Sequence, residues 1–225
     1  MLNGEMSANF MERMRNLQEN NTIVKFLLNQ NQLAYKEYIS PDATLGRIKY
    51  RSKHPTEFAV FKCMDGRLNL ATSTGTPVGI IQPFRNIGGK FDLGWGNFGH
   101  MVNGWVKYSM KKNRNCVPII TYHFSKKSRH GGCAGHGYNT AEAIIEAKKL
   151  LEQFRLAFGE ERKNVHPILV GIETEADALI FHGDDGSTFD MSKHFSMSEG
   201  QILEALSGLY PSMNDEMRTD LAQLV

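Results

Sequence analysis

Hydrophobic residues recur along the chain at two spacings, which predict helices and short buried strands. Apolar positions at helical spacing predict two N-terminal helices between residues 5 and 37, separated at Asn20 and Asn21. Further helices are predicted over residues 97–112, 140–158 and 197–209. Continuous apolar runs predict strands over residues 58–61, 78–84, 117–122, 168–172 and 178–182. The polar, basic residues 40–56 are interpreted as a connection, and no element is predicted after residue 209.

The alternation of strands and helices indicates the fold class. It is typical of an α/β domain with a mainly parallel central β-sheet flanked by helices. Residues 1–40 are interpreted as an N-terminal helical arm that contacts the partner in a dimer, and residues 41–225 as the α/β domain. Ligands of parallel sheets collect at the carboxyl ends of the strands, so residues that directly follow strands are the first candidates for a site.

Composition narrows the class of protein. The chain has 225 residues, of which 41% are hydrophobic, and this is enough for one substantial core. A formal net charge of +2 indicates no general attraction to nucleic acid or to a membrane surface. No apolar run reaches the roughly 20 residues of a membrane span, and the polar start lacks the core of a secretory signal. Three cysteines, an odd number, favour reduced thiols. We therefore expect a cytoplasmic protein.

Three side chains that can bind metal follow two of the predicted strands. Cys63 follows the first strand, and His130 and Cys133 lie in the glycine-rich HGGC segment after a later one. Thiolate and imidazole are preferred zinc ligands, and catalytic zinc usually has three protein ligands and an open fourth position. A single cysteine after a strand is most often a buried core residue. The combination favours a zinc site, whereas Cys116, which has no such neighbours, is assigned to structure.

Asp65 and Arg67 follow Cys63 at alternate positions, so in an extended segment they share a face. An arginine can hold a carboxylate with two hydrogen bonds and keep it ionised. An ionised carboxylate beside zinc can accept a hydrogen bond from a bound hydroxide. A surface ion pair of little energetic weight is the alternative, but the proximity of Cys63 favours a catalytic role.

Three segments in this order resemble the β-class carbonic anhydrases: C-M-D-G-R from Cys63, R-N-I-G from Arg85, and H-G-G-C-A-G from His130. The resemblance covers roughly residues 55–182. It implies an α/β sheet and a homodimer, or a higher homo-oligomer, that exchanges N-terminal helices, with active sites near the interface.

The same resemblance implies a chemistry. It implies zinc bound by Cys63, His130 and Cys133, with Asp65 and Arg67 as the catalytic pair. The implied enzyme is a carbonic anhydrase, a zinc lyase that hydrates carbon dioxide reversibly to bicarbonate by attack of a zinc-bound hydroxide.

The histidine ligand has alternatives, because the chain departs from the family at this point. The family's histidine usually ends its strand, as His123 does here, and FSKKSR separates it from His130. The spacing to Cys133 favours His130 over His123, and His136 is a third candidate.

Two further departures concern the substrate pocket. Plant-type members have a glutamine nine residues before the first cysteine ligand, and His54 stands there in this chain. The segment 85–99 is rich in glycine and contains Phe91, Trp95 and Phe98. It either walls a hydrophobic pocket for carbon dioxide or packs the interface.

Other functions fit parts of the pattern. The same zinc site could hydrolyse a linear analogue of carbon dioxide, such as carbon disulfide or carbonyl sulfide. A non-catalytic zinc-binding homologue is another alternative, but it would need neither Asp65 nor Arg67. Nucleotide binding is disfavoured, because RNIGGKFDLGWG lacks the G-x-G-x-x-G spacing and the P-loop lysine.

Overall fold

Two compact units make up the chain, Met1–Ile48 and Lys49–Val225. The computed structural model describes residues 22–159, 163–176, 178–194 and 196–224. The helix predicted before Asn20 lies outside these residues. Within the described ranges, no helix is both long enough and apolar enough to span a bilayer.

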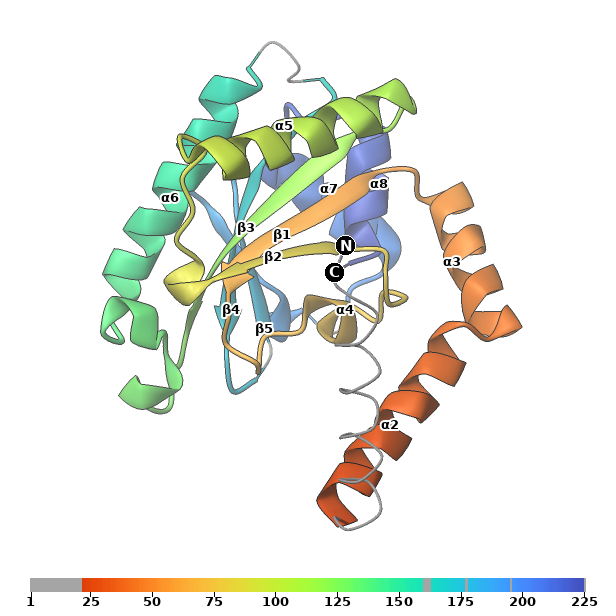
Figure 1. Ribbon diagram of the computed structural model, residues 1–225. Helices are drawn as coiled ribbons and strands as arrows, with labels where there is room; N and C mark the ends of the chain where they lie inside the picture. The colour runs from red at the N-terminus through yellow and green to blue at the C-terminus, as the bar shows by residue number, and fades with distance from the viewer. Residues whose placement is uncertain (1–21, 160–162, 177, 195, 225) are drawn as a thin grey trace. The chain divides into compact units, whose positions relative to one another are not determined.

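A six-stranded sheet forms the centre of the second unit (Figure 1). Its strands are β1 (Glu57–Cys63), β2 (Gln82–Asn86), β3 (Cys116–Phe124), β4 (Ile168–Glu173), β5 (Ala178–His182) and β6 (Thr188–Asp190). They lie in the order β2-β1-β3-β4-β5-β6. The first four strands in this order run parallel, and β5 and β6 are antiparallel to their neighbours. The predicted α/β class with a mainly parallel sheet is confirmed.

Helices cover both faces of this sheet. The α-helices described are α2 (Thr22–Tyr38), α3 (Pro41–Lys53), α4 (Leu70–Ser73), α5 (Gly96–Lys111), α6 (Thr140–Ala157), α7 (Glu199–Leu209) and α8 (Asp215–Ala222). Helices α5 and α6 lie on one face, and α7 and α8 on the other (Figure 1). Alternate residues of β1 enter the two cores, since Phe61 packs on the α5 and α6 side and Val60 on the α7 and α8 side. Burial on both faces explains why β1 and β3 are continuously apolar.

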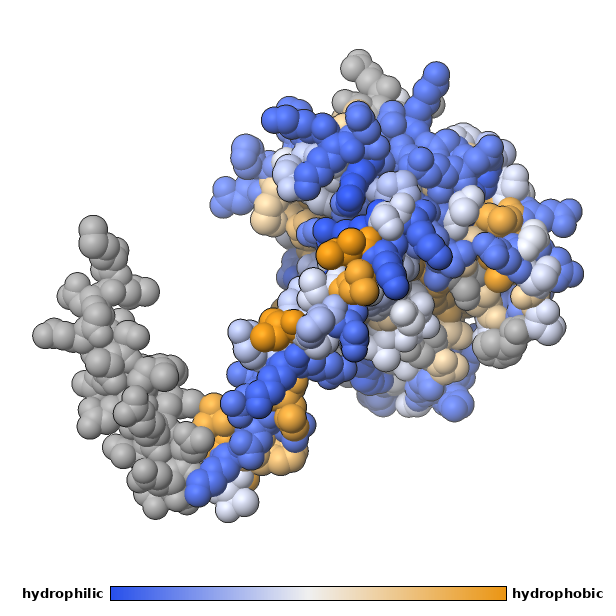
Figure 2. All heavy atoms as spheres, turned by 90° about the vertical axis from the view of Figure 1, so that its right-hand side faces the viewer, coloured by the Kyte–Doolittle hydropathy of each residue, from blue (hydrophilic) through white to orange (hydrophobic). Residues whose placement is uncertain are grey.

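The N-terminal helices have no core of their own among the described residues. Neither α2 nor α3 contains a buried residue. Hydrophobic side chains are visible on their surface between hydrophilic ones (Figure 2). The predicted arm of residues 1–40 falls within the first unit.

The segment predicted as a connection, residues 40–56, contains helix α3 instead. The hydroxyl of Ser40 accepts a hydrogen bond from the backbone N–H of Ala43 at 3.1 Å, and Pro41 takes the first helical position. Serine before a helix and proline at its first residue are start signals, because they satisfy or remove N–H groups that have no partner within the helix. The Ser-Pro pair therefore begins a helix within the segment interpreted as a connection.

Other elements also differ from the sequence prediction, which contains neither the short helix α4 nor the short strand β6. The strand predicted from residue 78 begins only at Gln82, because Gly79 has a φ of +95°, which no extended strand contains. The C-terminal segment, for which no element is predicted, forms α8, and its Met217 and Leu221 are fully buried. The segment after residue 209 is therefore part of the core.

This packing of α8 can be tested with two leucines. Replacing Leu221, which is 0% exposed, by alanine should lower the free energy of unfolding by about 2–5 kcal/mol, because it leaves a cavity in the core. The matched control Leu156→Ala, at a side chain 83% exposed, should change it by no more than about 0.5 kcal/mol. Urea denaturation of both variants measures the difference. Equal effects would show that α8 does not pack as described.

Candidate metal centre

The ends of two adjacent parallel strands bring the first two residues of the site together. Cys63 is the last residue of β1, and His123 is the last but one of β3. Because β1 and β3 pair in parallel, their carboxyl ends lie at the same edge of the sheet. After β3 the chain passes through the short 3-10 helix η2 (Arg129–Gly131) and returns to the same edge at Cys133.

Cys63, His123 and Cys133 form a compact buried group. Their ligand atoms all lie within 4.8 Å of one another, and the three residues are 8%, 2% and 3% exposed. The two sulfur atoms are 3.9 Å apart. Two thiolates bound to one tetrahedral zinc at about 2.3 Å each are about 3.8 Å apart, so the observed spacing fits a shared zinc ion.

The imidazole of His123 offers one ring nitrogen to this group. Its Nδ1 lies 3.1 Å from the hydroxyl oxygen of Thr174. Its Nε2 is buried and has no hydrogen-bond partner in the part of the chain that the structure describes. Buried polar atoms almost always have a partner, so an unpaired Nε2 beside two thiols is the arrangement expected of a metal ligand.

The two thiols interact directly. Cys133 donates a hydrogen bond to the sulfur of Cys63, and this bond is the largest cause of a lowered pKa of Cys63. Burial opposes the shift, while the backbone N–H groups of Asp65 and Gly88 add to it. The same thiol–thiol bond raises the pKa of Cys133. One sulfur is therefore prepared as a thiolate, and the second proton is the one that metal binding has to release.

His130 does not join the thiols, which corrects the expectation drawn from its spacing to Cys133. Its side chain is exposed, and its ring packs edge-on against Tyr138 at 4.8 Å. Strand β3 continues through His123 to Phe124, so the histidine at the strand end keeps the position beside the cysteines. The spacing argument failed because η2 directs His130 away from the group.

Asp65 and Arg67 are paired as the sequence predicts. Oδ1 of Asp65 accepts from the backbone N–H and from Nε of Arg67, both at 3.0 Å, and Oδ2 accepts from Nη2 at 2.6 Å. The guanidinium beside Asp65 lowers the pKa of its carboxyl to about 2. Asp65 is thus ionised at neutral pH, two residues from Cys63, and it is not a member of the three-residue group.

The segments R-N-I-G from Arg85 and H-G-G-C-A-G from His130 form contacts that hold the loops around the site in place. Nε2 of His136 donates to the carbonyl of Gly88 at 2.8 Å, so this third candidate histidine supports the loop instead of joining the group. A Cβ on Gly135 would lie 2.6 Å from the Cα of Gly88, so the close approach of the two loops requires glycine. Nη2 of Arg85 donates to the carbonyl of Leu68, just after the Asp65–Arg67 segment, at 3.3 Å.

The aromatic segment after Arg85 contributes to the core. Phe91 and Phe98 are each 8% exposed and stack with their ring centroids 5.0 Å apart. Both rings meet Phe61 of β1 edge-on. Trp95, which is 51% exposed, remains at the surface. The two phenylalanines therefore help to support the strand that carries Cys63, a role the sequence did not indicate.

His54 lies far from the metal centre of its own chain. Its Nδ1 pairs with Oδ1 of the buried Asp220 at 3.0 Å, and Asp220 also accepts from the backbone N–H of Thr56 at 2.8 Å. His54 and Thr56 share Asp220 at the amino end of β1, whereas Cys63 is at its carboxyl end, and the rise of about 3.3 Å per residue puts these two ends about 20 Å apart. Within one chain His54 cannot contact a substrate bound at the metal centre.

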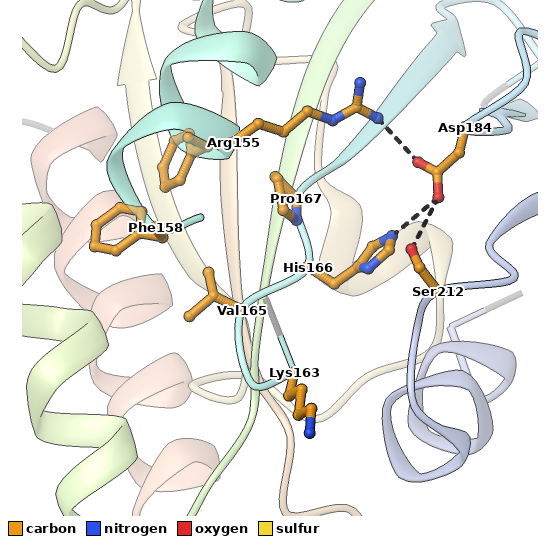
Figure 3. A pocket seen from close by; sticks show the side chains of 9 residues that line it. Arg155, Phe158, Lys163, Val165, His166, Pro167, Asp184 and Ser212 are labelled. Carbon is orange, nitrogen blue, oxygen red and sulfur yellow. Dashed lines mark hydrogen bonds and ion pairs between the residues drawn. The ribbon is translucent and has the colours of Figure 1, made fainter. Parts of the chain in front are cut away.

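A cavity of about 390 Å³ lies elsewhere, at the opposite edge of the sheet (Figure 3). Asp184 accepts from Nη2 of Arg155 at 2.9 Å and lies 3.6 Å from Nε2 of His166. His166 precedes β4, so the cavity is at the amino end of that strand, whereas the metal centre is at the carboxyl ends. Because the group of ligand atoms, and not this cavity, has the chemistry of a reaction centre, the cavity is assigned no part in the reaction.

Comparison with known proteins gives a family match that covers most of the chain. The family model described as the catalytic domain of carboxysome shell carbonic anhydrase matches residues 54–219. The carboxysome shell carbonic anhydrase of Prochlorococcus marinus is 30% identical over 147 residues, which cover 57% of this chain and 28% of that protein. The enzyme of the same name from Halothiobacillus neapolitanus is 31% identical over 100 residues, which cover 38% of this chain and 20% of that protein. The chain thus spans less than a third of either relative.

The solved structures to which the chain is similar include β-carbonic anhydrases, at low sequence identity. The β-carbonic anhydrase CcaA is 12% identical with a TM-score of 0.49, and the alignment covers 72% of this chain and 98% of that one. The β-carbonic anhydrase CafA from Aspergillus fumigatus is 13% identical with a TM-score of 0.46, and the alignment covers 83% of this chain and 98% of that one.

Proposed function

Since the chain belongs to the carboxysome shell carbonic anhydrase family, we propose that it hydrates carbon dioxide reversibly to bicarbonate at a zinc ion held by Cys63, His123 and Cys133. The observation that carries this proposal is the buried group of two thiols and one unpaired imidazole nitrogen, within 4.8 Å of one another. His123 replaces His130 as the proposed histidine ligand, because only His123 lies in this group.

The residues around the group have separate roles in the proposed reaction. Zinc bound there supplies a Lewis acid that lowers the pKa of a coordinated water. Asp65 is kept ionised by Arg67, so its carboxylate can only accept hydrogen bonds and can orient the reacting water by accepting one of its protons. Since Arg67 occupies both carboxylate oxygens, it also restrains Asp65 from turning into the metal position.

Two alternatives use the same donor group. Hydrolysis of carbon disulfide or carbonyl sulfide needs the same zinc chemistry, and the family match favours carbon dioxide. A purely structural zinc site needs no ionised carboxylate beside it, so the Asp65–Arg67 pair favours an enzyme. Parallel assays of carbon dioxide hydration and carbonyl sulfide hydrolysis distinguish the substrates.

The relatives' name also bears on location and partners. Both are carboxysome shell proteins by name, so we extend the expectation of a cytoplasmic protein to one associated with carboxysomes within the cytoplasm. We also propose a homodimer, since α2 exposes Phe26, Leu27 and Leu33, each by 58% or more. Leu33 lies seven positions after Phe26 and six after Leu27, so the three side chains share one face of the helix, and an apolar stripe of this kind is usually covered by a partner.

The metal ligands can be tested by a pair of histidine variants. The wild-type chain should hold about one zinc ion, and His123→Ala should lose most of it together with carbon dioxide hydration, because a three-ligand site loses one ligand. The matched control His130→Ala should retain both. Zinc content by mass spectrometry of the purified proteins and stopped-flow hydration assays measure this. Zinc lost from the His130 variant and kept by the His123 variant would refute the assignment.

The pH dependence of hydration tests the donor set. Two thiolates cancel the charge of Zn²⁺, whereas three imidazoles leave it intact and bring the pKa of bound water to about 7. The pKa of water bound to zinc at this site should therefore be higher than about 7. The rate of carbon dioxide hydration should then rise between about pH 6 and about pH 9. Asp65 adds no step in this range, because its pKa is about 2 and its ionised form is lost only as the pH falls toward that value. A flat profile would contradict the account.

The proposed dimer can be tested on α2. Replacing both Phe26 and Leu33 by aspartate should convert a dimer into monomers at micromolar concentration, because charges would enter an apolar interface. The control places the same two charges at Asn31 and Gln32 of the same helix. Sedimentation equilibrium compares the three proteins. A wild-type monomer, or a dimer that survives the Phe26 and Leu33 changes, would exclude α2 as the contact.

A further inference from the structure

Thr174 lies immediately after β4 and contacts the end of β3. Its backbone N–H donates to the carbonyl of Phe124 at 2.8 Å, and its side-chain hydroxyl donates to the same carbonyl at 3.0 Å. Both hydrogen-bond donors of Thr174 are therefore directed at a single acceptor. The hydroxyl oxygen keeps its lone pairs for another partner.

That partner is the imidazole of His123. Its Nδ1 lies 3.1 Å from the Thr174 hydroxyl oxygen. Since the hydroxyl proton is directed to Phe124, the oxygen acts as an acceptor, and Nδ1 has to carry the hydrogen. A neutral imidazole protonated on Nδ1 has its lone pair on Nε2, which is the buried nitrogen beside the two cysteine sulfurs.

A buried carboxylate holds the turn that carries Thr174. Glu173 is 4% exposed and accepts hydrogen bonds from the backbone N–H groups of Lys126, Glu175 and Ala176 at 2.9, 3.2 and 2.6 Å. These bonds tie the turn after β4 to the segment that leaves β3. The hydroxyl of Thr174 is thus held in place by the structure around it and not only by its own rotamer.

We propose that Thr174 is a positioning residue of the metal centre, which fixes the ring orientation and the tautomer of His123 so that Nε2 faces Cys63 and Cys133. This inference rests on the proposed function for the identity of the metal, zinc. The tautomer itself follows from the contacts of Thr174 and is independent of the metal. Loss of such an outer partner of a ligating histidine typically weakens metal binding by about 10–100-fold.

The test compares Thr174→Val, which removes the hydroxyl, with Thr174→Ser, which retains it. The zinc dissociation constant of the full chain, measured by competition with a chromophoric chelator, should rise about 10–100-fold in the valine variant and stay near the wild-type value in the serine variant. Thr121→Val is the matched control, because Thr121 also has a buried hydroxyl bonded to a backbone carbonyl, that of Phe61 at 3.1 Å. It should bind zinc as tightly as the wild type.

A second measurement needs no variant to fold. Nitrogen-15 NMR of the zinc-free wild-type chain should show His123 protonated on Nδ1. Protonation on Nε2, or equal zinc affinity of Thr174→Val and the wild type, would overturn the inference. A wild-type chain that binds no zinc would overturn the proposed function instead, and the NMR measurement would still decide the role of Thr174.

Discussion

The parallel pairing of β1 with β3 is the constraint on which the site depends. It places Cys63 and His123 at the same edge of the sheet, although 60 positions separate them in the chain. The pairing is maintained by apolar cores on both faces, one of which includes Phe61, Phe91 and Phe98 directly beside the strand that carries Cys63. Only Cys133 has to be brought in by a loop, and that loop is fixed by its close packing on Gly88.

Electrostatics then separate the roles of the groups at this edge. The thiols of Cys63 and Cys133 share a hydrogen bond, and so one of them gives up its proton readily. Asp65 is held ionised by Arg67, which bonds to both of its carboxylate oxygens. Without a metal, the negative charge at the centre therefore comes from one thiolate, and the ionised Asp65 is a separate hydrogen-bond acceptor two residues from Cys63.

The sequence predicted much of this arrangement, and its errors have physical reasons. The sequence predicts the strands that carry Cys63 and His123, because buried strands are continuously apolar. It also predicts the pairing of Asp65 with Arg67, because alternate residues of an extended segment share a face. The sequence does not identify His123 as the histidine beside the cysteines. The spacing to Cys133 favours His130, and this spacing does not show that the 3-10 helix η2 directs His130 outward. The sequence does not predict helix α8, because DEMRTDLA is mostly polar and one of its four buried residues, Asp220, is itself charged.

In the proposed metal centre, two sulfur atoms and one imidazole nitrogen hold zinc. X-ray absorption spectroscopy at the zinc edge of the purified chain tests this ligand set directly, because sulfur and nitrogen scatter at different distances. The expected first shell contains two sulfur atoms at about 2.3 Å, one nitrogen at about 2.0 Å and one further light atom. A first shell without sulfur, a shell with a single sulfur, or a chain that retains no zinc would contradict it.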